Sequence, residues 1–219
     1  MDKTLTDIAN RLELDKGTIM PTEGHHGPRL HFTTIYEKYM EKPKSILEIG
    51  VLDGKSLKMW KEYFPDAKVY GIDLHPKCTS SEIYTADQSS REQLKDVMEK
   101  IGGVDIIVDD GSHVIEHQQI SLGFLYKYLN KGGQYWIEDL HTSDNQWQDK
   151  TLYGYAMDFK EYDSTVNFMK RCIKSDYDST FMTQEELKYL KDNTSDVKLF
   201  NLPKTFYGEN NLGLFIKNV

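Results

Sequence analysis

The stretch Val104-Asp105-Ile106-Ile107-Val108-Asp109-Asp110-Gly111-Ser112-His113 decides the fold. An apolar run with β-branched residues stops abruptly at two carboxylates, a glycine, a serine and a histidine. This pattern is typical of a buried parallel strand whose carboxyl end opens into a ligand site. In open α/β sheets, ligands bind at the carboxyl ends of the strands. The stretch therefore predicts an edge where acids and a histidine hold a metal ion and accept a proton.

Strand-like and helical segments alternate on both sides of this stretch. The predicted strands are Ser45–Gly50, Lys68–Asp73, Ser81–Ala86, Val104–Asp109 and Gln134–Glu138, and the helices between them are Lys55–Phe64, Arg91–Ile101 and Ile115–Leu129. Such alternation predicts βαβ units and a mostly parallel sheet in an α/β fold. Two further strands, Val197–Leu202 and Leu212–Lys217, are too close for a helical crossover, so we expect an antiparallel hairpin there.

Residues 1–44 precede the first predicted strand and look helical in two pieces. The pieces are Thr6–Leu14 and Thr33–Met40, with the loop Gly24-His25-His26-Gly27-Pro28 between them. We interpret 1–44 as a helical segment with a lid, and 45–219 as the main domain. The polar segment Asp139–Gly154 predicts a loop at the site. It is followed by predicted helices at Tyr155–Ser175 and Thr183–Lys191.

Composition limits the classes of function that the chain can have. The 219 residues include 27 basic and 35 acidic ones, giving a formal net charge of −8. This sign disfavours binding to nucleic acid phosphates or to an anionic membrane, and favours a small or neutral partner. The sequence is compatible with a homo-oligomer but does not predict one.

Nothing in the sequence suggests secretion. Cys78 and Cys172 form no CxxC pair, so we expect free thiols. The start Met1-Asp2-Lys3-Thr4 has no apolar signal core. No stretch approaches the roughly 18 apolar residues of a membrane span. A cytoplasmic location is the expectation.

A glycine-containing turn follows the first predicted strand, in Glu48-Ile49-Gly50-Val51-Leu52-Asp53-Gly54-Lys55-Ser56. Gly50 and Gly54 allow the backbone to approach a ligand closely. The spacing differs from the G-x-G-x-x-G of dinucleotide sites. Glu48, two residues before Gly50, suits a cationic group such as the amino group of a methionine moiety.

Acids end three more of the predicted strands. Asp73 lies where such folds place an acid for ribose hydroxyls. Asp87 can accept a hydrogen bond from an adenine amino group, and Gln88 can add an amide. Each acid could instead cap the following helix. With Glu48, Asp73, Asp87 and Asp109 all at strand ends, an adenosine-type cofactor is the better interpretation.

These motifs together resemble the class I S-adenosylmethionine-dependent methyltransferases. More narrowly, the sequence is similar to the metal-dependent macrolide-sugar O-methyltransferases of the mycinamicin and macrocin type, and to the related family named after cephalosporin hydroxylase. The stretches that carry the resemblance are Asp15-Lys16-Gly17, Tyr36-Glu37, Leu47–Val51, Gly54–Trp60, Asp87-Gln88-Ser89, Asp109–His113 and Ile137-Glu138-Asp139. They span most of Asp15 to Ser143, and beyond Tyr153 only the closing hairpin matches.

The resemblance implies a Rossmann-like class I methyltransferase fold with a seven-stranded sheet, and S-adenosylmethionine as the cofactor. It implies that Thr33, Tyr36 and Asp109 contact this cofactor. The expected cofactor-binding set is completed by Glu48, Gly50, Val51, Gly54, Ser56, Asp73, Asp87 and Gln88.

Three further acids follow neighbouring strands and should converge at one edge. Asp110, Glu138 and Asp139 are carboxylates without nearby thiolates, and such a set favours Mg²⁺ or another hard divalent ion. His113 lies three residues beyond Asp110 and should face the same edge. The resemblance implies the same roles, with the three acids as metal ligands and His113 as the catalytic base.

These groups suit methyl transfer to an oxygen. A sugar hydroxyl is a poor nucleophile at neutral pH, but a metal ion lowers its pKa and orients it, and a histidine can then remove the proton. A vicinal diol could chelate the ion through both oxygens. The sequence therefore predicts an Mg²⁺-dependent O-methyltransferase whose small-molecule acceptor is sugar-like or bears another diol.

Two alternatives stay open at this stage. His113-Val114-Ile115-Glu116-His117 matches the H-x-x-E-H signature of zinc peptidases, which needs both histidines on one helix face. Its position directly after a strand end is the wrong context for that motif. The name of the related cephalosporin-hydroxylase family also raises an oxidoreductase or hydroxylase, although the missing G-x-G-x-x-G argues against NAD.

Overall fold

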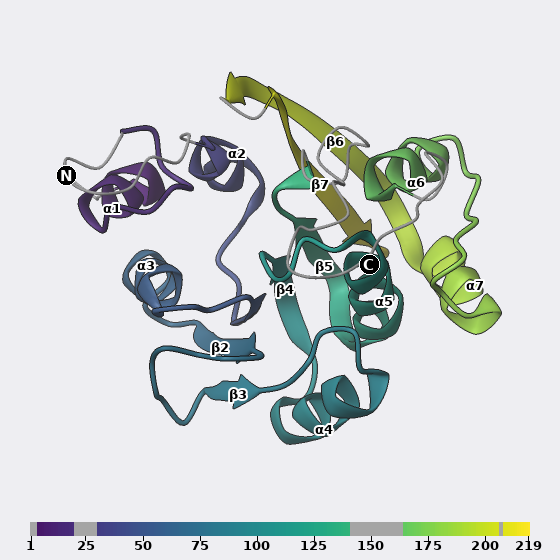
Figure 1. Cartoon of the computed structure of the whole chain (residues 1–219), viewed down its shortest axis with the longest axis horizontal. Helices are drawn as coiled ribbons and strands as arrows, with labels where there is room; N and C mark the ends of the chain where they lie inside the picture. The colour runs from purple at the N-terminus through teal and green to yellow at the C-terminus, as the bar shows by residue number, and fades with distance from the viewer. Residues whose placement is uncertain (1–3, 20–29, 141–163, 206–207) are drawn as a thin grey trace.

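A seven-stranded sheet with helices on both faces forms the centre of the molecule (Figure 1). The computed structural model describes residues 4–19, 30–140, 164–205 and 208–219. The strands are β1 (Ser45–Ile49), β2 (Lys68–Asp73), β3 (Ile83–Thr85), β4 (Val104–Asp109), β5 (Leu129–Ile137), β6 (Thr194–Thr205) and β7 (Gly208–Lys217). The helices are α1 (Leu5–Arg11), α2 (Phe32–Tyr39), α3 (Lys55–Tyr63), α4 (Arg91–Ile101), α5 (Ile115–Leu125), α6 (Thr165–Cys172) and α7 (Gln184–Asn193).

The strand order is β3-β2-β1-β4-β5-β7-β6. β1 to β5 pair with one another in parallel, whereas β7 runs antiparallel to both β5 and β6. The mostly parallel sheet and the C-terminal hairpin are thus confirmed. β1 and β4 lie side by side at the centre and are buried along most of their length, as expected for apolar strands covered on both faces.

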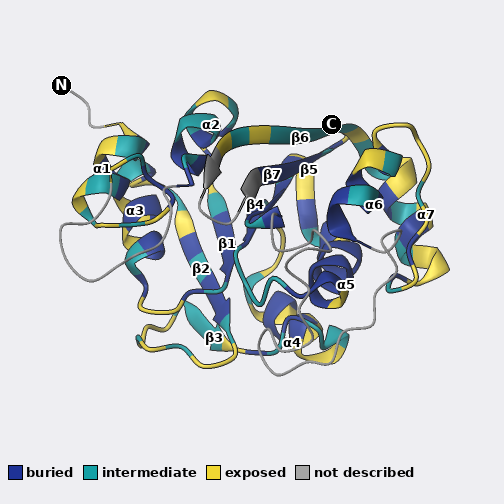
Figure 2. Cartoon of the chain, turned by 45° about the horizontal axis from the view of Figure 1, so that its top comes forward, coloured by how far each residue is buried: buried dark blue, intermediate teal, exposed yellow. Residues whose placement is uncertain are grey.

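Two hydrophobic clusters cover the two faces of the sheet. One cluster joins residues of α1, α2 and α3 to one side of the sheet, and the other joins residues of α4, α5, α6 and α7 to the opposite side. Figure 1 shows these two helix layers on either side of the strands. In Figure 2 the central strands and α5 are mostly dark blue, because α5 packs between the sheet and the outer helices.

The predicted boundaries near β5 were wrong. α5 ends at Leu125 and a short 3₁₀ turn (Tyr126–Tyr128) follows, so the predicted helix to Leu129 is too long. β5 begins at Leu129 rather than Gln134, because Leu129 already pairs with Val104. The register shifts before Ile106 pairs with Gln134, and Gly132 adopts a φ of 73° within the extra residues. A register shift of this kind leaves no alternation of apolar and polar residues in the sequence, so the start of β5 could not be predicted from the pattern.

The described part of residues 1–44 packs onto the sheet rather than standing apart. Thr4 caps α1 through a capping box with Asp7, and Leu5, Ile8 and Ala9 are buried in the same cluster as Trp60. The helix predicted for Thr6–Leu14 is one turn shorter at its end. The predicted lid loop, the segment Asp139–Gly154 after Leu140 and the first half of the predicted helix Tyr155–Ser175 lie outside the described residues.

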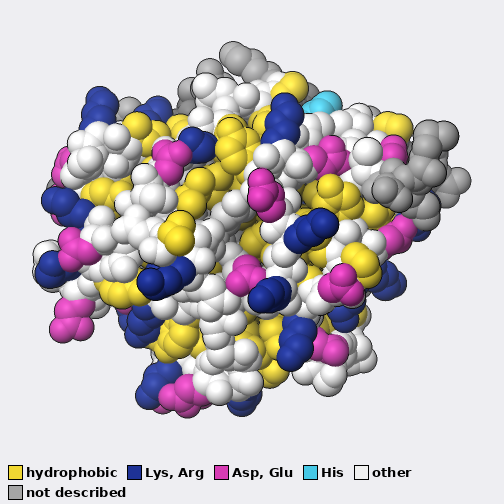
Figure 3. All heavy atoms as spheres, turned by 180° about the vertical axis from the view of Figure 1, so that it is seen from behind, with side chains coloured by type: hydrophobic (Ala, Val, Ile, Leu, Met, Phe, Trp, Pro, Cys, Tyr) yellow, Lys and Arg dark blue, Asp and Glu magenta, His cyan; other side chains and the backbone are white. Residues whose placement is uncertain are grey.

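The surface carries charges of both signs. On the face opposite to that of Figure 1, Lys and Arg side chains alternate with Asp and Glu (Figure 3). Among the described residues, no helix is both long and apolar enough to cross a membrane.

Candidate functional site

The carboxyl ends of β1 and β4 meet at the centre of one edge of the sheet. Gly50 follows β1 with a φ of 87°, a conformation that favours glycine. A Cβ atom added there would lie 1.9 Å from the carbonyl oxygen of Asp110, which follows β4. The two turns therefore touch through their backbones, and the residues after both strands share one region.

A cavity of about 190 Å³ opens at this edge, above β1, β2 and the end of β3. Its lining comprises Ile49, Gly50, Asp73, Leu74, Ala86, Asp87, Gln88, Gly111, Ser112 and His117. Four of the predicted cofactor-binding residues, Gly50, Asp73, Asp87 and Gln88, thus line one cavity. Gly111 also permits a close approach, since an added Cβ would lie 2.0 Å from Oε1 of Gln88.

The two lining acids shape the loops around the cavity. Asp73 accepts hydrogen bonds of 2.9 Å from the backbone N–H groups of Val51 and Leu52, and one of 2.7 Å from His75. This ties the glycine-containing loop after β1 to the end of β2. Asp87 accepts hydrogen bonds from the backbone and the hydroxyl of Ser89. Both acids therefore fix backbone at the cavity rim.

Asp109 lies in a buried polar network behind the cavity. Its carboxylate accepts hydrogen bonds from Gln88 Nε2 (3.1 Å), Ser121 Oγ (2.7 Å) and Tyr135 Oη (3.3 Å). Gln88 in turn accepts a 2.6 Å hydrogen bond from the backbone N–H of Ser112. Burial raises the pKa of Asp109, although Ser121 and Gln88 oppose this. Its side chain is not among those that line the cavity.

The other predicted cofactor-binding residues lie around the end of β1. Glu48 is fully buried and accepts a 3.1 Å hydrogen bond from Trp60 Nε1. Gly54 is the N-cap residue just before α3 and has a φ of 77°, and Val51 and Ser56 are buried near it in the chain. Thr33 is buried too, and its hydroxyl donates to the backbone carbonyl of Lys16.

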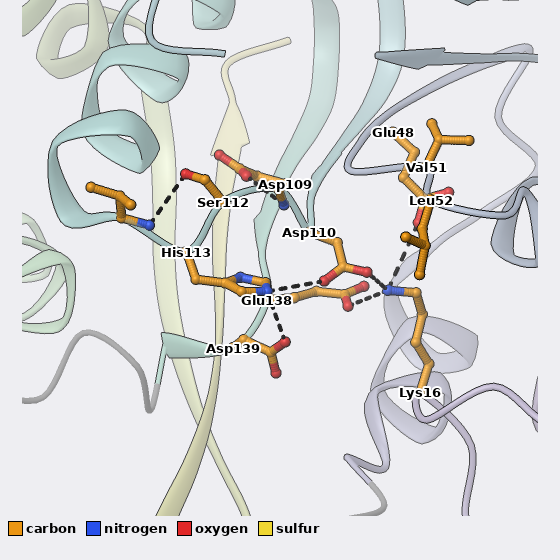
Figure 4. Close-up of polar contacts among 12 residues, drawn as sticks. Lys16, Glu48, Val51, Leu52, Asp109, Asp110, Ser112, His113, Glu138 and Asp139 are labelled. Carbon is orange, nitrogen blue, oxygen red and sulfur yellow. Dashed lines mark hydrogen bonds and ion pairs between the residues drawn. The ribbon is translucent and has the colours of Figure 1, made fainter. Parts of the chain in front are cut away.

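Asp110 and Glu138 both contact one lysine, Lys16, whereas among the described residues the group spaced to hold a metal ion joins Asp110 to Asp139 and His113, without Glu138. Nζ of Lys16 contacts Oδ2 of Asp110 and Oε2 of Glu138, and lies 3.8 Å from Oε1 of Glu48 (Figure 4). Glu138 also accepts a 2.5 Å hydrogen bond from the hydroxyl of Tyr36. Both oxygens of Glu138 therefore have protein partners in this structure.

His113 completes the cluster on the side away from Lys16 (Figure 4). Its Nε2 lies 3.5 Å from Oδ2 of Asp139 and 4.0 Å from Oδ1 of Asp110. One ligand atom from each of these three residues lies within 4.8 Å of the others, a spacing that could hold a metal ion. His113 and Asp139 have φ values of 58° and 52°, in the left-handed region. Non-glycine residues held there are concentrated at functional sites.

Burial of so many acids shifts their protonation. It raises the pKa of Glu48 and of Asp139 to about 7, although Lys16 opposes the first shift and His113 the second. The pKa values of Asp110 and Glu138 are raised as well, again by burial first. For Lys16, burial favours the neutral amine, but Asp110, Glu138 and Glu48 outweigh it and raise the pKa. The cluster therefore needs positive charge to ionise fully.

The structure separates the two histidines of the H-x-x-E-H stretch, so the shared helix face that the zinc-peptidase motif needs is absent from it. α5 begins only at Ile115, so His113 lies before the helix. His117 lies on the helix, and its Nδ1 is 2.9 Å from Ser112 Oγ at the cavity wall, whereas His113 faces Asp110 and Asp139. The strained turn at His113 accounts for the difference, because it directs the chain away from a continuous helix.

The sequence of the chain is similar to those of several known proteins. The chain is 39% identical over 157 residues to the 8-demethyl-8-alpha-L-rhamnosyl tetracenomycin-C 2'-O-methyltransferase of Streptomyces olivaceus, covering 65% of this chain and 40% of that protein. It is 34% identical over 124 residues to the mycinamicin VI 2''-O-methyltransferase of Micromonospora griseorubida, covering 52% of this chain and 31% of that protein. A comparison with protein-family models finds no match.

A solved structure extends the similarity to the whole fold. The MycE methyltransferase from the mycinamycin biosynthetic pathway, in complex with Mg, SAH and mycinamycin VI, superposes with a TM-score of 0.71 at 23% identity. The alignment covers 99% of this chain and 55% of that one. The chain has the class I methyltransferase fold. The two relatives are named as O-methyltransferases, and the chain spans 40% of the length of the first and 31% of the length of the second.

One residue of this candidate site, Lys16, could not be recognised from the sequence as part of it. Lys16 contacts two of the predicted metal ligands, from which it is separated by 94 and 122 residues in the chain. Only its place in the Asp15-Lys16-Gly17 turn, which forms part of the resemblance, gave any signal. Ser112 and His117, which line the cavity, were also not predicted as cofactor-binding residues.

Proposed function

We propose that this chain transfers a methyl group from S-adenosylmethionine to a hydroxyl group of a sugar-like or other diol-bearing small molecule, with Mg²⁺ or another hard divalent ion as a second cofactor. One observation carries the proposal. Gly111 lines the cavity, and Asp110, the residue before it, belongs to the acid–histidine cluster. A methyl donor in the cavity and an acceptor at the cluster would therefore be neighbours.

The cavity has the features that an adenosine cofactor requires. Its rim offers acids at the ends of β2 and β3, in Asp73 and Asp87, and glycine backbone at Gly50 and Gly111. Acids at these strand ends suit ribose hydroxyls and an adenine amino group. In this proposal Gln88 lines the cavity and Asp109 holds its amide from behind, and the remaining cofactor-binding residues are Thr33, Tyr36, Glu48, Val51, Gly54 and Ser56.

The acid cluster fits a hard divalent ion. Carboxylate oxygens are the ligands that Mg²⁺ prefers, and no thiolate belongs to the cluster of described residues. Asp110, Glu138 and Asp139 would hold the ion, with Asp110 and Asp139 already facing one another across His113. When bound, Mg²⁺ supplies Lewis-acid activation and orientation of the acceptor hydroxyl.

His113 is the proposed proton acceptor. Its Nε2 faces Asp110 and Asp139, so the imidazole lies at the cluster without being part of the core. Asp139 orients the ring and stabilises the imidazolium that forms when a proton arrives. The strained backbone at His113 fixes this orientation before any substrate binds.

The nature of the acceptor follows from the relatives' names and from the acids. One similar protein is named for O-methylation of a rhamnosyl tetracenomycin, and the other for O-methylation of mycinamicin VI. Two adjacent sugar hydroxyls would suit an ion held by carboxylates on one side only. A glycosylated small molecule is therefore the proposed acceptor class.

Binding and turnover measurements test this proposal together. Calorimetric titration should show S-adenosylhomocysteine binding and no NAD binding. Incubation with radiolabelled S-adenosylmethionine and a panel of rhamnosylated and other glycosylated compounds should label a product in the presence of Mg²⁺. Binding of NAD in place of S-adenosylhomocysteine would contradict the proposal and revive the oxidoreductase alternative.

A further inference from the structure

Lys16 brings a positive charge into the centre of the acid cluster. Its side chain is only 2% exposed, and its ammonium contacts Asp110 and Glu138, which follow two adjacent strands (Figure 4). A third acid, Glu48 at the end of β1, lies 3.8 Å away. A buried lysine is stable in its charged form only with such partners. The ammonium is therefore the cation that balances these acids in the structure.

The backbone around Lys16 fixes it in this position. The carbonyl of Lys16 accepts hydrogen bonds from the N–H and the hydroxyl of Thr33, at the start of α2. The neighbouring carbonyls of Asp15 and Gly17 accept from Leu30 and His31. The turn is thus attached to the segment that leads into α2, so that the side chain is aimed at the cluster from the helix layer.

The contacts of the ammonium overlap with those that a metal ion needs. Of the four carboxylate oxygens of Asp110 and Glu138, Lys16 contacts one on each residue, and Tyr36 donates to a third. A divalent ion bound by both residues would lie a few ångströms from the ammonium. Repulsion between the two cations would be strong in this buried setting, since it scales inversely with distance and dielectric constant.

We propose that Lys16 is an internal counter-cation that takes the place of a divalent ion between Asp110 and Glu138, and that metal binding displaces its ammonium from them. The inference rests on the metal site of the proposed function. It makes Lys16 a determinant of metal affinity, because every metal ion that enters must first break the ion pairs of this buried lysine with Asp110 and Glu138. It also links metal occupancy to the turn at residues 15–17 and hence to the start of α2.

The alternative is a permanent ion pair that holds Asp110 and Glu138 in place for the metal. The two interpretations predict opposite results when the charge of Lys16 is removed. Displacement predicts tighter metal binding in Lys16→Met, because the competing cation is gone. A permanent supporting role predicts weaker binding, because the acids lose the group that positions them.

Mn²⁺ titration, followed by the loss of the free-ion electron paramagnetic resonance signal, separates these outcomes without any activity measurement. We expect Lys16→Met to bind Mn²⁺ at least about tenfold more tightly than the unmodified chain. Lys217→Met is the matched control, because Lys217 is also buried but donates to the carbonyls of Tyr126 and Leu129, away from the site. Its Mn²⁺ affinity should be unchanged. Equal or weaker binding in Lys16→Met would overturn the inference.

Removal of Lys16 could also leave the acids unbalanced and the metal-free variant unfolded. Lys16→Gln keeps a donor for one carboxylate and provides a second variant. For both variants, the rise in melting temperature on adding Mg²⁺ should exceed that of the unmodified chain, and a smaller rise would count against displacement. If Asp110→Asn loses Mn²⁺ binding while both Lys16 variants bind Mn²⁺ as the unmodified chain does, the displacement of Lys16 is contradicted but the metal site of the proposed function is not. No Mn²⁺ binding in any form, with methyl transfer that survives chelation, removes the metal from the proposed function as well.

Discussion

Gly50 and Asp110 touch through their backbones, so that an added Cβ on Gly50 would lie 1.9 Å from the carbonyl oxygen of Asp110. This contact joins the turn after β1, which lines the cavity, to the turn after β4, which carries the acid–histidine cluster. The proposed cofactor cavity and the proposed metal site thus both depend on the close approach of these two turns, which only a glycine at position 50 permits.

Gly50→Ala should therefore destabilise the fold and weaken cofactor binding. The variant combines a left-handed backbone with a clash against backbone that cannot move aside, and we expect a loss of about 3 kcal/mol or more. Gly132→Ala is the control, because Gly132 has a similar φ of 73° but its added Cβ would meet nothing closer than 4.0 Å. It should lose about 1 kcal/mol. Urea unfolding and S-adenosylhomocysteine titration measure both, and equal losses would show that the contact is not decisive.

Removal of the metal should stop methyl transfer. We expect excess chelator to abolish turnover and added Mg²⁺ to restore it, because the acceptor hydroxyl needs an activating ion. Asp110→Asn should lower metal affinity by about tenfold or more, since one charged ligand is lost. Full activity in chelator, or an unchanged affinity in Asp110→Asn, would contradict the proposed ligands.

His113→Ala should lose turnover while cofactor binding is retained. Loss of a general base typically reduces the rate by about a hundredfold or more. The residue does not line the proposed cofactor cavity, so the affinity for S-adenosylhomocysteine should stay the same. His75→Ala, an exposed histidine after β2, provides the control and should behave like the unmodified chain. Near-normal turnover in His113→Ala would place the base elsewhere.

The architecture of the sheet was predictable because it depends on local patterns. β1 and β4 are apolar runs that end at polar residues, and each lies within one residue of the predicted bounds. The closing hairpin followed from a short connection between two apolar segments. By contrast, residues 129–133 of β5 carry little apolar alternation, and they join the sheet only because a register shift accommodates them.

The sequence was sufficient to predict which acids belong to the candidate site, but not which side chains contact those acids. Asp110, Glu138 and Asp139 could be expected together because parallel strands end at a common edge. The contact of Lys16 with Asp110 and Glu138 depends on how residues 15–17 attach to the start of α2, which no periodicity encodes. The position of Asp109 likewise depends on Ser121 and Tyr135 from other elements.

The stability of the metal-free protein should fall as the pH rises from about 4.5 to about 7. Burial raises the pKa of Glu48 from its ordinary 4.5 to about 7, so the folded state binds this proton more tightly than the unfolded state does. The stabilisation is complete below the unfolded pKa and is lost as the pH approaches the folded one, up to about 3 kcal/mol in all. Glu48→Gln mimics the protonated acid and should make the profile less steep between pH 5 and pH 8, as measured by urea unfolding in chelator, with the remaining slope due to Asp139 and the other buried acids. Glu116→Gln removes an exposed acid instead and should reproduce the original slope. Parallel profiles for Glu48→Gln and the unmodified chain would show that Glu48 stays ionised through its contacts with Lys16 and Trp60.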